Sequence, residues 1–509
     1  MSAIKKLAGQ TLWYGLPTIA SRFLGYIMNL SLPLFFAQPS VTADLTQIYA
    51  MIPFLNVVFT YGLETAYFRF SKEEDPAKLY STLSWSLIGT TILFTTIVLN
   101  FSGSLVRWAN LETHPEYIRW MIAILFFDTI STLAFAKLRL ENRPRKYAVV
   151  RLSSILVNIV CVLLFLGIIP SYLVKHPDSK WAFFSTNNIG IGYYLIGNLA
   201  GSLLTFILLW KEFKQIKIFF NSTLWKKVMK YSYPLIIVGM GGMVNDMLSR
   251  LIYQHVVDLP AAAAKHELGI FGNIYRLAVL ITILIQAFRM AAEPFFFKQS
   301  TEGNAQKTYA RVMKFFVIAC CYMFLFISLF IEIFAWFFNA IHKPLWTEGL
   351  YIVPLLAFGN IFLGIYYNLS IWYKLTDKNN MGAFITLAGS FITILLNILL
   401  IPKLHYLGAA IATFVCYMFM MVISYKLGQK YYPVPYALRK LIAYLTVVCL
   451  IYGIHKLVLL FVPKLWLGIV LGIFFIYQFS RLIFWAEKNE LEKIPLFKKF
   501  LRVQQTTTN

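Results

Sequence analysis

Charged residues are scarce in this 509-residue sequence, and acidic residues are the scarcest of them. Asp, Glu, Lys and Arg together make up 13% of the chain, about half of what an ordinary soluble domain carries. Hydrophobic residues make up 59%, which is more apolar surface than the polar shell of a soluble globule can cover. A soluble fold is therefore excluded, and the composition indicates a protein that buries its apolar surface in a bilayer.

Residues for catalysis and metal binding are also sparse. The five cysteines all lie within apolar stretches, without the spacing of a metal site or a disulfide framework. The seven histidines are scattered, no Walker loop is present, and no pair of carboxylates stands in a loop of the size that an enzyme site needs. We therefore predict that the chain is not an enzyme and binds no metal or other cofactor, with coupling to H+ or Na+ left open.

Long apolar runs recur along the whole chain, separated by short polar breaks, and each run has the length of a membrane span. Aromatic residues make up 17% of the sequence, and many stand near the ends of these runs, as in interfacial belts. We predict an all-α integral membrane protein with fourteen transmembrane helices, at roughly 11–36, 44–68, 80–105, 117–137, 148–170, 186–210, 231–256, 267–292, 310–338, 346–373, 381–401, 406–427, 437–460 and 465–486.

The basic residues alternate across these spans. With the N-terminus placed in the cytoplasm, 34 of the 46 Lys and Arg residues fall in cytoplasmic segments, nine fall on the opposite side and three lie inside spans. This is the positive-inside pattern, and it predicts that both termini are cytoplasmic. The net charge of +24 is spread over many short segments, so it does not indicate a nucleic-acid partner.

A weak internal repeat suggests two halves. Spans one and seven open with Tyr14-Gly-Leu-Pro17 and Tyr231-Ser-Tyr-Pro234, and spans two and eight both close with aromatic residues and a cation. Transporters are often built from such repeats, with the substrate site between them. We predict an N-lobe of six helices over 1–226, a C-lobe of six helices over 227–430, and a C-terminal helix pair with a cytoplasmic tail over 431–509.

Arg22 lies near the middle of the first span, where a charge is costly. Thr18, Arg22, Gly25 and Asn29 are spaced by four, three and four residues, which places them on one helical face. We interpret Arg22 as a cation that meets a substrate anion, with Asn29 on the same cavity wall. The alternative is a structural Arg22 that pairs with a carboxylate on a neighbouring helix.

Four more ionisable residues lie inside spans. Asp246 and Arg250 are four residues apart, so they either neutralise one another or contact a substrate or ion. Arg276 is a candidate second anion contact or an interfacial anchor. Asp128 is a candidate for ion coupling or for pairing with Arg22.

Several segments resemble the polysaccharide-biosynthesis flippase family. They are Ser21-Arg-Phe-Leu-Gly25, Tyr61-Gly-Leu-Glu-Thr-Ala-Tyr-Phe-Arg69, Asn245-Asp246, and Glu267-Leu-Gly-Ile-Phe-Gly-Asn-Ile-Tyr-Arg276. This is the Wzx-type branch of the multidrug/oligosaccharidyl-lipid/polysaccharide exporter superfamily, which also contains the lipid II flippases. The resemblance covers nearly the whole chain in helix count and spacing.

The resemblance implies two six-helix bundles around a central cavity, a multidrug-exporter-like fold, with two further helices at the C-terminus. It implies a flippase that moves undecaprenyl-pyrophosphate-linked oligosaccharide units across the bacterial inner membrane by alternating access, for O-antigen, capsule or exopolysaccharide. Membrane lipids and other polysaccharide-assembly membrane proteins are the implied partners. Arg22 and Arg276 match the family's pyrophosphate-binding arginines, whereas the usual arginine early in the second helix has no counterpart, since only Asp44 stands there.

Two other functions remain as alternatives. An ion-coupled multidrug exporter of the same fold would use Asp128 or Asp246, and it would tolerate the loss of Arg22. A membrane O-antigen polymerase or ligase would need a substantial outer loop with catalytic groups, and the short loops of this sequence disfavour it.

Overall fold

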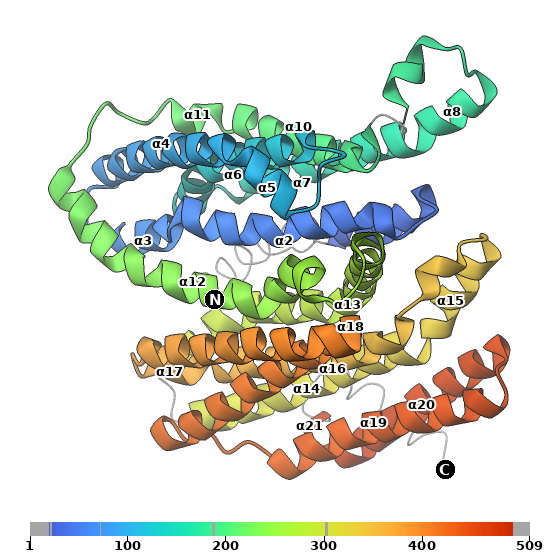
Figure 1. Cartoon of the computed structure of the whole chain (residues 1–509). Coiled ribbons are helices and arrows are strands. Elements are labelled where there is room, and N and C mark those ends of the chain that lie inside the picture. The colour runs from blue at the N-terminus through green and yellow to red at the C-terminus, as the bar shows by residue number, and fades with distance from the viewer. Residues whose placement is uncertain (1–19, 21–22, 72, 186–188, 301–303, 492–509) are drawn as a thin grey trace. The chain divides into compact units, whose positions relative to one another are not determined.

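The computed structural model describes residues 20, 23–71, 73–185, 189–300 and 304–491, apart from the side chains of Ala291, Glu293, Pro294, Phe297 and Lys298. Helices dominate, and no strand occurs among the described residues (Figure 1). The predicted fold class, an all-helical membrane protein, is confirmed. Arg22, the foremost sequence-based candidate, lies outside the described residues.

Eleven described helices are long and apolar enough to cross a membrane. The longest, α18 (Asn379–Tyr431), is two helices joined across a kink, because His405 has a non-helical backbone conformation. Two shorter apolar helices, Phe23–Phe35 and Gly192–Leu208, fall at the first and sixth predicted spans. These elements lie where the predicted spans lie, and the total of fourteen stays a prediction because the first span begins outside the described residues.

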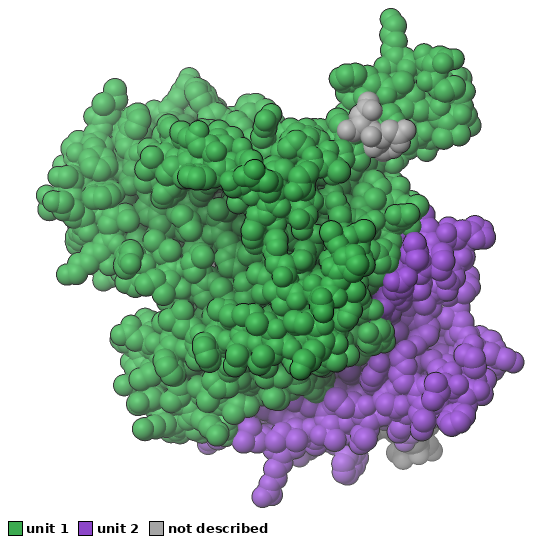
Figure 2. Space-filling view, in the orientation of Figure 1, with its two compact units in different colours: residues 1–305, 351–433 green, residues 306–350, 434–509 purple. Residues whose placement is uncertain are grey.

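The chain forms two compact units, coloured separately in Figure 2. Unit 1 comprises Met1–Ala305 and Tyr351–Pro433, and unit 2 comprises Gln306–Leu350 and Val434–Asn509. The first unit therefore contains both the predicted N-lobe and most of the predicted C-lobe. Its main helices are α2 (Ser40–Thr60), α3 (Leu63–Phe70), α4 (Pro76–Asn100), α6 (Glu116–Leu140), α7 (Pro144–Val162), α10 (Gly192–Leu208), α12 (Ser222–Val256), α13 (Ala261–Gln299), α16 (Val353–Leu369) and α18.

The N-lobe part of unit 1 is built from α4, α6, α7 and α10, which lie side by side in Figure 1. Gly197 and Gly201 on α10 face α7, and a Cβ at Gly201 would stand only 2.7 Å from the carbonyl oxygen of Ser154. Small residues four apart allow membrane helices to approach closely. This contact brings the polar side chains of α7 and α10 onto a common wall.

Helices α2 and α13 pack together near their first residues, in a region that we call the closed end (residues 39–47 and 261–272). A Cβ at Gly269 would stand 2.1 Å from the carbonyl oxygen of Pro39, and a Cβ at Gly272 would stand 2.1 Å from Oγ1 of Thr46. At Gly269 the two backbones are close enough to require glycine, and at Gly272 a larger residue would displace the Thr46 side chain. Further along both helices, residues of α2 and α13 line the cavity described below.

Polar contacts hold the closed end together. Lys265 Nζ lies 2.6 Å from Oδ1 of Asp44, whose side chain is 9% exposed. Gln47 donates a hydrogen bond of 3.0 Å to the carbonyl oxygen of Leu251. Near Leu251 on the same helix, α12, Gln254 accepts a hydrogen bond of 3.2 Å from Asn110, which precedes α6. The closed end is thus sealed by packing, an ion pair and hydrogen bonds.

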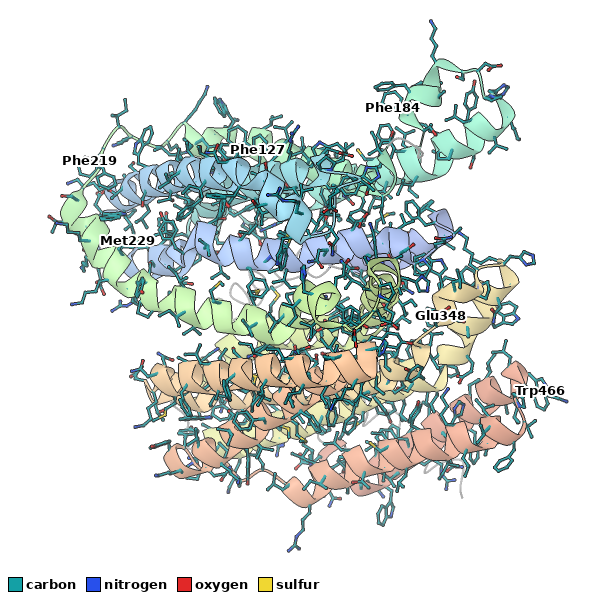
Figure 3. The ribbon with its side chains drawn as sticks, in the orientation of Figure 1. Phe127, Phe184, Phe219, Met229, Glu348 and Trp466 are labelled. Carbon is teal, nitrogen blue, oxygen red and sulfur yellow. The ribbon has the colours of Figure 1, made fainter. Side chains whose placement is uncertain are left out.

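A hairpin between α7 and α10 projects from unit 1. It contains a π-helical segment (Leu163–Ile168), α8 (Ile169–Lys175) and a 3-10 helix (Lys180–Phe184). Figure 3 shows Phe184 on this projection, where its ring packs against Phe165 and Trp181. Aromatic residues at the end of a span are typical of a membrane interface.

Unit 2 consists of α14 (Ala305–Leu329, whose first residue belongs to unit 1), α15 (Ile331–Ala340), α19 (Leu438–Phe461) and α20 (Leu465–Ala486). Its polar centre is Glu487, which is 2% exposed. The Glu487 carboxylate accepts hydrogen bonds from Lys314, from Lys440 at 2.9 Å and from the Tyr444 hydroxyl at 2.6 Å. One carboxylate at the end of α20 therefore joins the consecutive helices α19 and α20 to α14, which is more than 100 residues earlier in the sequence.

Candidate functional site

A cavity of about 900 Å³ lies in unit 1. Helices α2, α3, α6, α7 and α10 form one side of it, and α13 and α16 form the other. Its nearest lining residue to the closed end on α2 is Tyr49, and it extends along α2 and α3 to Thr65. The volume is at the upper end of what small-molecule sites offer, so the cavity has room for a large head group.

Hydroxyl and amide side chains cover the N-lobe side of the cavity. They recur every three or four residues on α6, α7 and α10, so each helix turns one polar stripe toward the cavity. The stripes contain Asp128, Ser131, Thr132, Arg151, Ser154, Asn198, Ser202 and Thr205. The C-lobe side contributes only Gln286, Arg289, Met290 and Tyr367. The capacity for hydrogen bonding is thus concentrated on the N-lobe side.

Asp128, a predicted ion-coupling or arginine-pairing residue, has its side chain exposed on the cavity wall. The Ser202 hydroxyl is its hydrogen-bonding neighbour, and Arg151 is close enough to attract its charge. The Arg151 guanidinium stacks on the ring of Phe135, 4.2 Å from its centroid. A second carboxylate of the cavity, Glu64, forms an ion pair with Arg139.

Arg276, a predicted anion contact, lies behind the wall of the cavity. Its charge interacts with the hydroxyls of Tyr49 and Tyr194, and Tyr49 itself lines the cavity. Nη1 of Arg276 is buried and has no hydrogen-bond partner among the described residues. A buried guanidinium group that leaves a donor unused is costly, so this position is suited to receive an anion.

Asn29, the other polar candidate on the first span, faces the same region. Its side-chain amide donates to the carbonyl oxygen of Gly25 at 2.8 Å, and it interacts with the hydroxyl of Tyr194. The rings of Tyr49 and Tyr194 meet edge to face, with centroids 5.8 Å apart. The structure therefore brings Asn29 and Arg276, predicted from different spans, to the same pair of tyrosines.

Asp246 and Arg250 neutralise one another on α12. Nη2 of Arg250 lies 3.6 Å from Oδ1 of Asp246 and donates to the Asp246 carbonyl oxygen at 2.7 Å. Tyr275 completes the group, because its hydroxyl donates to Asp246 at 2.9 Å and its ring lies 3.9 Å below the Arg250 guanidinium. Neither residue lines the cavity, and their roles in substrate or ion binding stay predictions.

Sequence reasoning did not single out Arg139, Arg151 and Arg289 as site residues, because it counted them as basic residues of cytoplasmic segments. All three line the cavity. Arg289 stacks on Tyr367 with 4.8 Å between the guanidinium and the ring centroid. The spacing of Tyr147, Arg151 and Ser154 by four and three residues was the available signal, because it places a cation on a polar helical face.

Residues 7–300 match the model of a family described as "Polysaccharide biosynthesis protein". None of the curated protein sequences matches the chain. Among solved structures, the chain is similar to the lipid II flippase MurJ in an inward closed conformation. That likeness has a TM-score of 0.66 and 15% identity over 93% of this chain and 99% of that chain.

Two multidrug transporters of the MATE family also share the fold. An inward-facing one has a TM-score of 0.58 and 13% identity over 80% of this chain and 93% of that chain. An outward-facing one has a TM-score of 0.55 and 13% identity over 83% and 94% of the two chains. At such identities the likeness shows a common fold and leaves the substrate to be argued from the site.

Proposed function

Because this chain belongs to the polysaccharide biosynthesis protein family, we propose that it is a flippase for lipid-linked oligosaccharides. The proposed substrate is an undecaprenyl-pyrophosphate carrying an oligosaccharide repeat unit, for O-antigen, capsule or exopolysaccharide assembly. The proposed membrane is the bacterial cytoplasmic membrane, with both termini in the cytoplasm. The positive-inside distribution of Lys and Arg supports this orientation.

The Nη1 donor of Arg276, which has no hydrogen-bond partner within the described part of the chain and lies beside a large polar cavity, supports the proposal most strongly. A pyrophosphate needs fixed cations in a surrounding of low dielectric constant, and guanidinium groups donate to phosphate oxygens in a forked geometry. Arg276 and Arg22 take this role, with Asn29 beside them. The sugars then occupy the hydroxyl- and amide-lined wall, and the lipid tail stays in the bilayer.

Transport proceeds by alternating access. The closed end blocks one side of unit 1, while the cavity extends away from it toward the basic residues Arg139 and Arg289. We assign this arrangement to the state that faces the cytoplasm. Opening of the closed end, coupled to a gradient of H+ or Na+ through Asp128 or Asp246, would release the head group on the other side.

The test is translocation of a fluorescent undecaprenyl-pyrophosphate oligosaccharide in proteoliposomes, comparing wild type with Arg276→Gln and Arg22→Gln. We expect at least a tenfold loss in each variant, because a buried charge-assisted contact to phosphate is removed. Arg145→Gln is the matched control, since Arg145 is exposed and does not line the cavity. Equal rates for Arg276→Gln and wild type would remove the residue from the head-group site.

The exposure of Asp128 in the cavity supports one alternative function, an ion-coupled exporter of cationic drugs, because a carboxylate there can bind a cation. The same liposomes separate the two proposals when they are loaded with a cationic dye. A drug exporter should lose dye efflux in Asp128→Asn and keep it in Arg276→Gln. A flippase should show the dependence on Arg276 with the lipid substrate and no dye efflux at all.

A further inference from the structure

The N-lobe side of the cavity carries two carboxylates and two cations, which come from α3, α6 and α7. Glu64 and Arg139 form an ion pair at one position. Asp128 on α6 and Arg151 on α7 are the other two charged residues, and Arg151 attracts the charge of Asp128. Among the described residues, the N-lobe side of the cavity therefore presents no excess of either sign, and the third lining cation, Arg289, belongs to the C-lobe side. A site that had to hold a charged sugar would present an excess of the opposite charge.

Asp128 and Arg151 are close without touching. No ion pair within 4.0 Å joins them or links either one to another charged group among the described residues, although both side chains are exposed on the cavity wall. Each is held by its own neighbour, Asp128 by the Ser202 hydroxyl and Arg151 by the ring of Phe135. Since both side chains line the cavity, a ligand group in the cavity that accepts from Arg151 and donates to Asp128 could use both of them.

A sugar hydroxyl does both, because it carries one donor and two acceptor lone pairs. The neighbouring side chains have the same dual character, namely Ser154 on α7 and Asn198 and Thr205 on α10. Ser131 also lines the cavity, and its buried Oγ has no hydrogen-bond partner among the described residues. The wall thus offers neutral polar groups around one carboxylate and one guanidinium.

From this geometry we infer that the α6–α7–α10 wall binds the glycan part of the substrate and selects repeat units of uncharged sugars. A sugar carboxylate would be attracted by Arg151 but repelled by Asp128. A sugar ammonium would be attracted by Asp128 but repelled by Arg151. Either would also lose its hydration inside the cavity. A neutral hydroxyl pays neither cost. This inference rests on the proposed flippase function and adds the class of glycan.

The experiment uses three undecaprenyl-pyrophosphate trisaccharides of equal length in proteoliposomes. One contains only neutral hexoses, one has a hexuronic acid in the middle, and one has a hexosamine with a free amine there. We expect wild type to translocate the neutral substrate about tenfold faster than either charged one. That ratio corresponds to an uncompensated charge interaction of roughly 1.4 kcal/mol.

The variants should then shift the preference in opposite directions. Asp128→Asn should raise the rate for the uronic-acid substrate relative to the neutral one by about tenfold, because the repelling carboxylate is gone. Arg151→Gln should do the same for the amine substrate and not for the uronic-acid substrate. Asp178→Asn and Arg145→Gln, which neutralise exposed charges outside the cavity, should leave both ratios as in wild type.

Three results would overturn the inference. The first is a wild type that moves all three substrates equally well, and the second is a pair of variants that shift both ratios alike or not at all. The third is an Asp128→Asn protein that no longer responds to an ion gradient with any substrate, which would make Asp128 the coupling residue. A wild type that translocates none of the three lipids is a different outcome, because it contradicts the flippase function itself.

Discussion

The ion pair at the closed end allows a quantitative prediction about conformation. Asp44→Asn removes the carboxylate that Lys265 contacts at 2.6 Å, and the two side chains are only 9% and 26% exposed. Removing one partner of a buried ion pair destabilises the state that contains the pair by about 3–5 kcal/mol. Because Lys265 is partly exposed, we expect about 2 kcal/mol for the closed state here. In an open state both groups are hydrated, so the substitution costs little there. The ratio of open to closed molecules should rise roughly thirtyfold.

Distances between two spin labels report this ratio. Glu112 and Asp258 are exposed and lie in neighbouring loops of unit 1, since Asn110 is hydrogen-bonded to Gln254 close by. Labels at these two positions, in a protein whose five cysteines have been replaced, should show a second population at longer distance in Asp44→Asn. Asp178→Asn, with its exposed carboxylate on the projecting hairpin, is the matched control.

The double variant Asp44→Leu with Lys265→Met makes the reasoning refutable. Replacing both partners of a buried pair by apolar residues is often neutral or stabilising, because no charge is left unpaired. The second population should therefore disappear again. An unchanged distance distribution in Asp44→Asn, or a larger open population in the double variant than in the single one, would show that the pair does not hold the closed end.

Three further predictions concern packing and stability. Gly269→Ala should push α13 away from α2 at the closed end, because the new Cβ would meet the carbonyl oxygen of Pro39. A cysteine introduced by Thr46→Cys should then react faster with a thiol reagent. Gly242→Ala, whose Cβ would have nothing within 4 Å, should not change this rate. Glu487→Gln should lower the thermal midpoint at neutral pH. Burial raises the pKa of Glu487, but hydrogen bonds from Lys314, Tyr444 and Lys440 outweigh it and hold the pKa below the usual 4.5. The stabilisation is therefore complete above pH 4.5 and is lost as the pH falls through the lowered pKa, so wild type and variant should converge in acid. Glu212→Gln should lower the midpoint by a few degrees, because this fully buried carboxylate contacts Arg143 at 2.9 Å and Lys146 at 2.5 Å, and an unchanged midpoint would contradict this.

The membrane-spanning architecture could be predicted from the sequence because it depends on local composition. A run of about 20 apolar residues is sufficient to identify a span, and the described helices lie where such runs occur. The kink at His405 falls between two predicted spans, so the single element α18 does not contradict them. The division into lobes depends on which helices contact one another, and hydropathy contains no information about that.

The cavity could be predicted only in part. Asp128 was recognised because a carboxylate in mid-span is conspicuous, and it does line the cavity. Arg151 and Arg289 were missed because they lie near basic segments, where the positive-inside rule already accounts for a cation. Which of two arginines faces a cavity depends on helix rotation and on contacts between α6, α7 and α10. Those contacts are set by Gly197 and Gly201 against α7, and the sequence alone does not say which helix these glycines face.

The discontinuity of unit 2 has a consequence for how the protein is made. Gln306–Leu350 leaves the ribosome before Tyr351–Pro433, which belongs to the other unit, and only then does Val434 begin the rest of unit 2. At about 5–20 residues per second the intervening 80 or so residues take roughly 4–16 s. During that interval Lys314 is already present while Glu487, its partner in the finished protein, has not been synthesised. The early helices of unit 2 must therefore stay in the membrane partly assembled until the last helix pair is made and Glu487 can pair with Lys314.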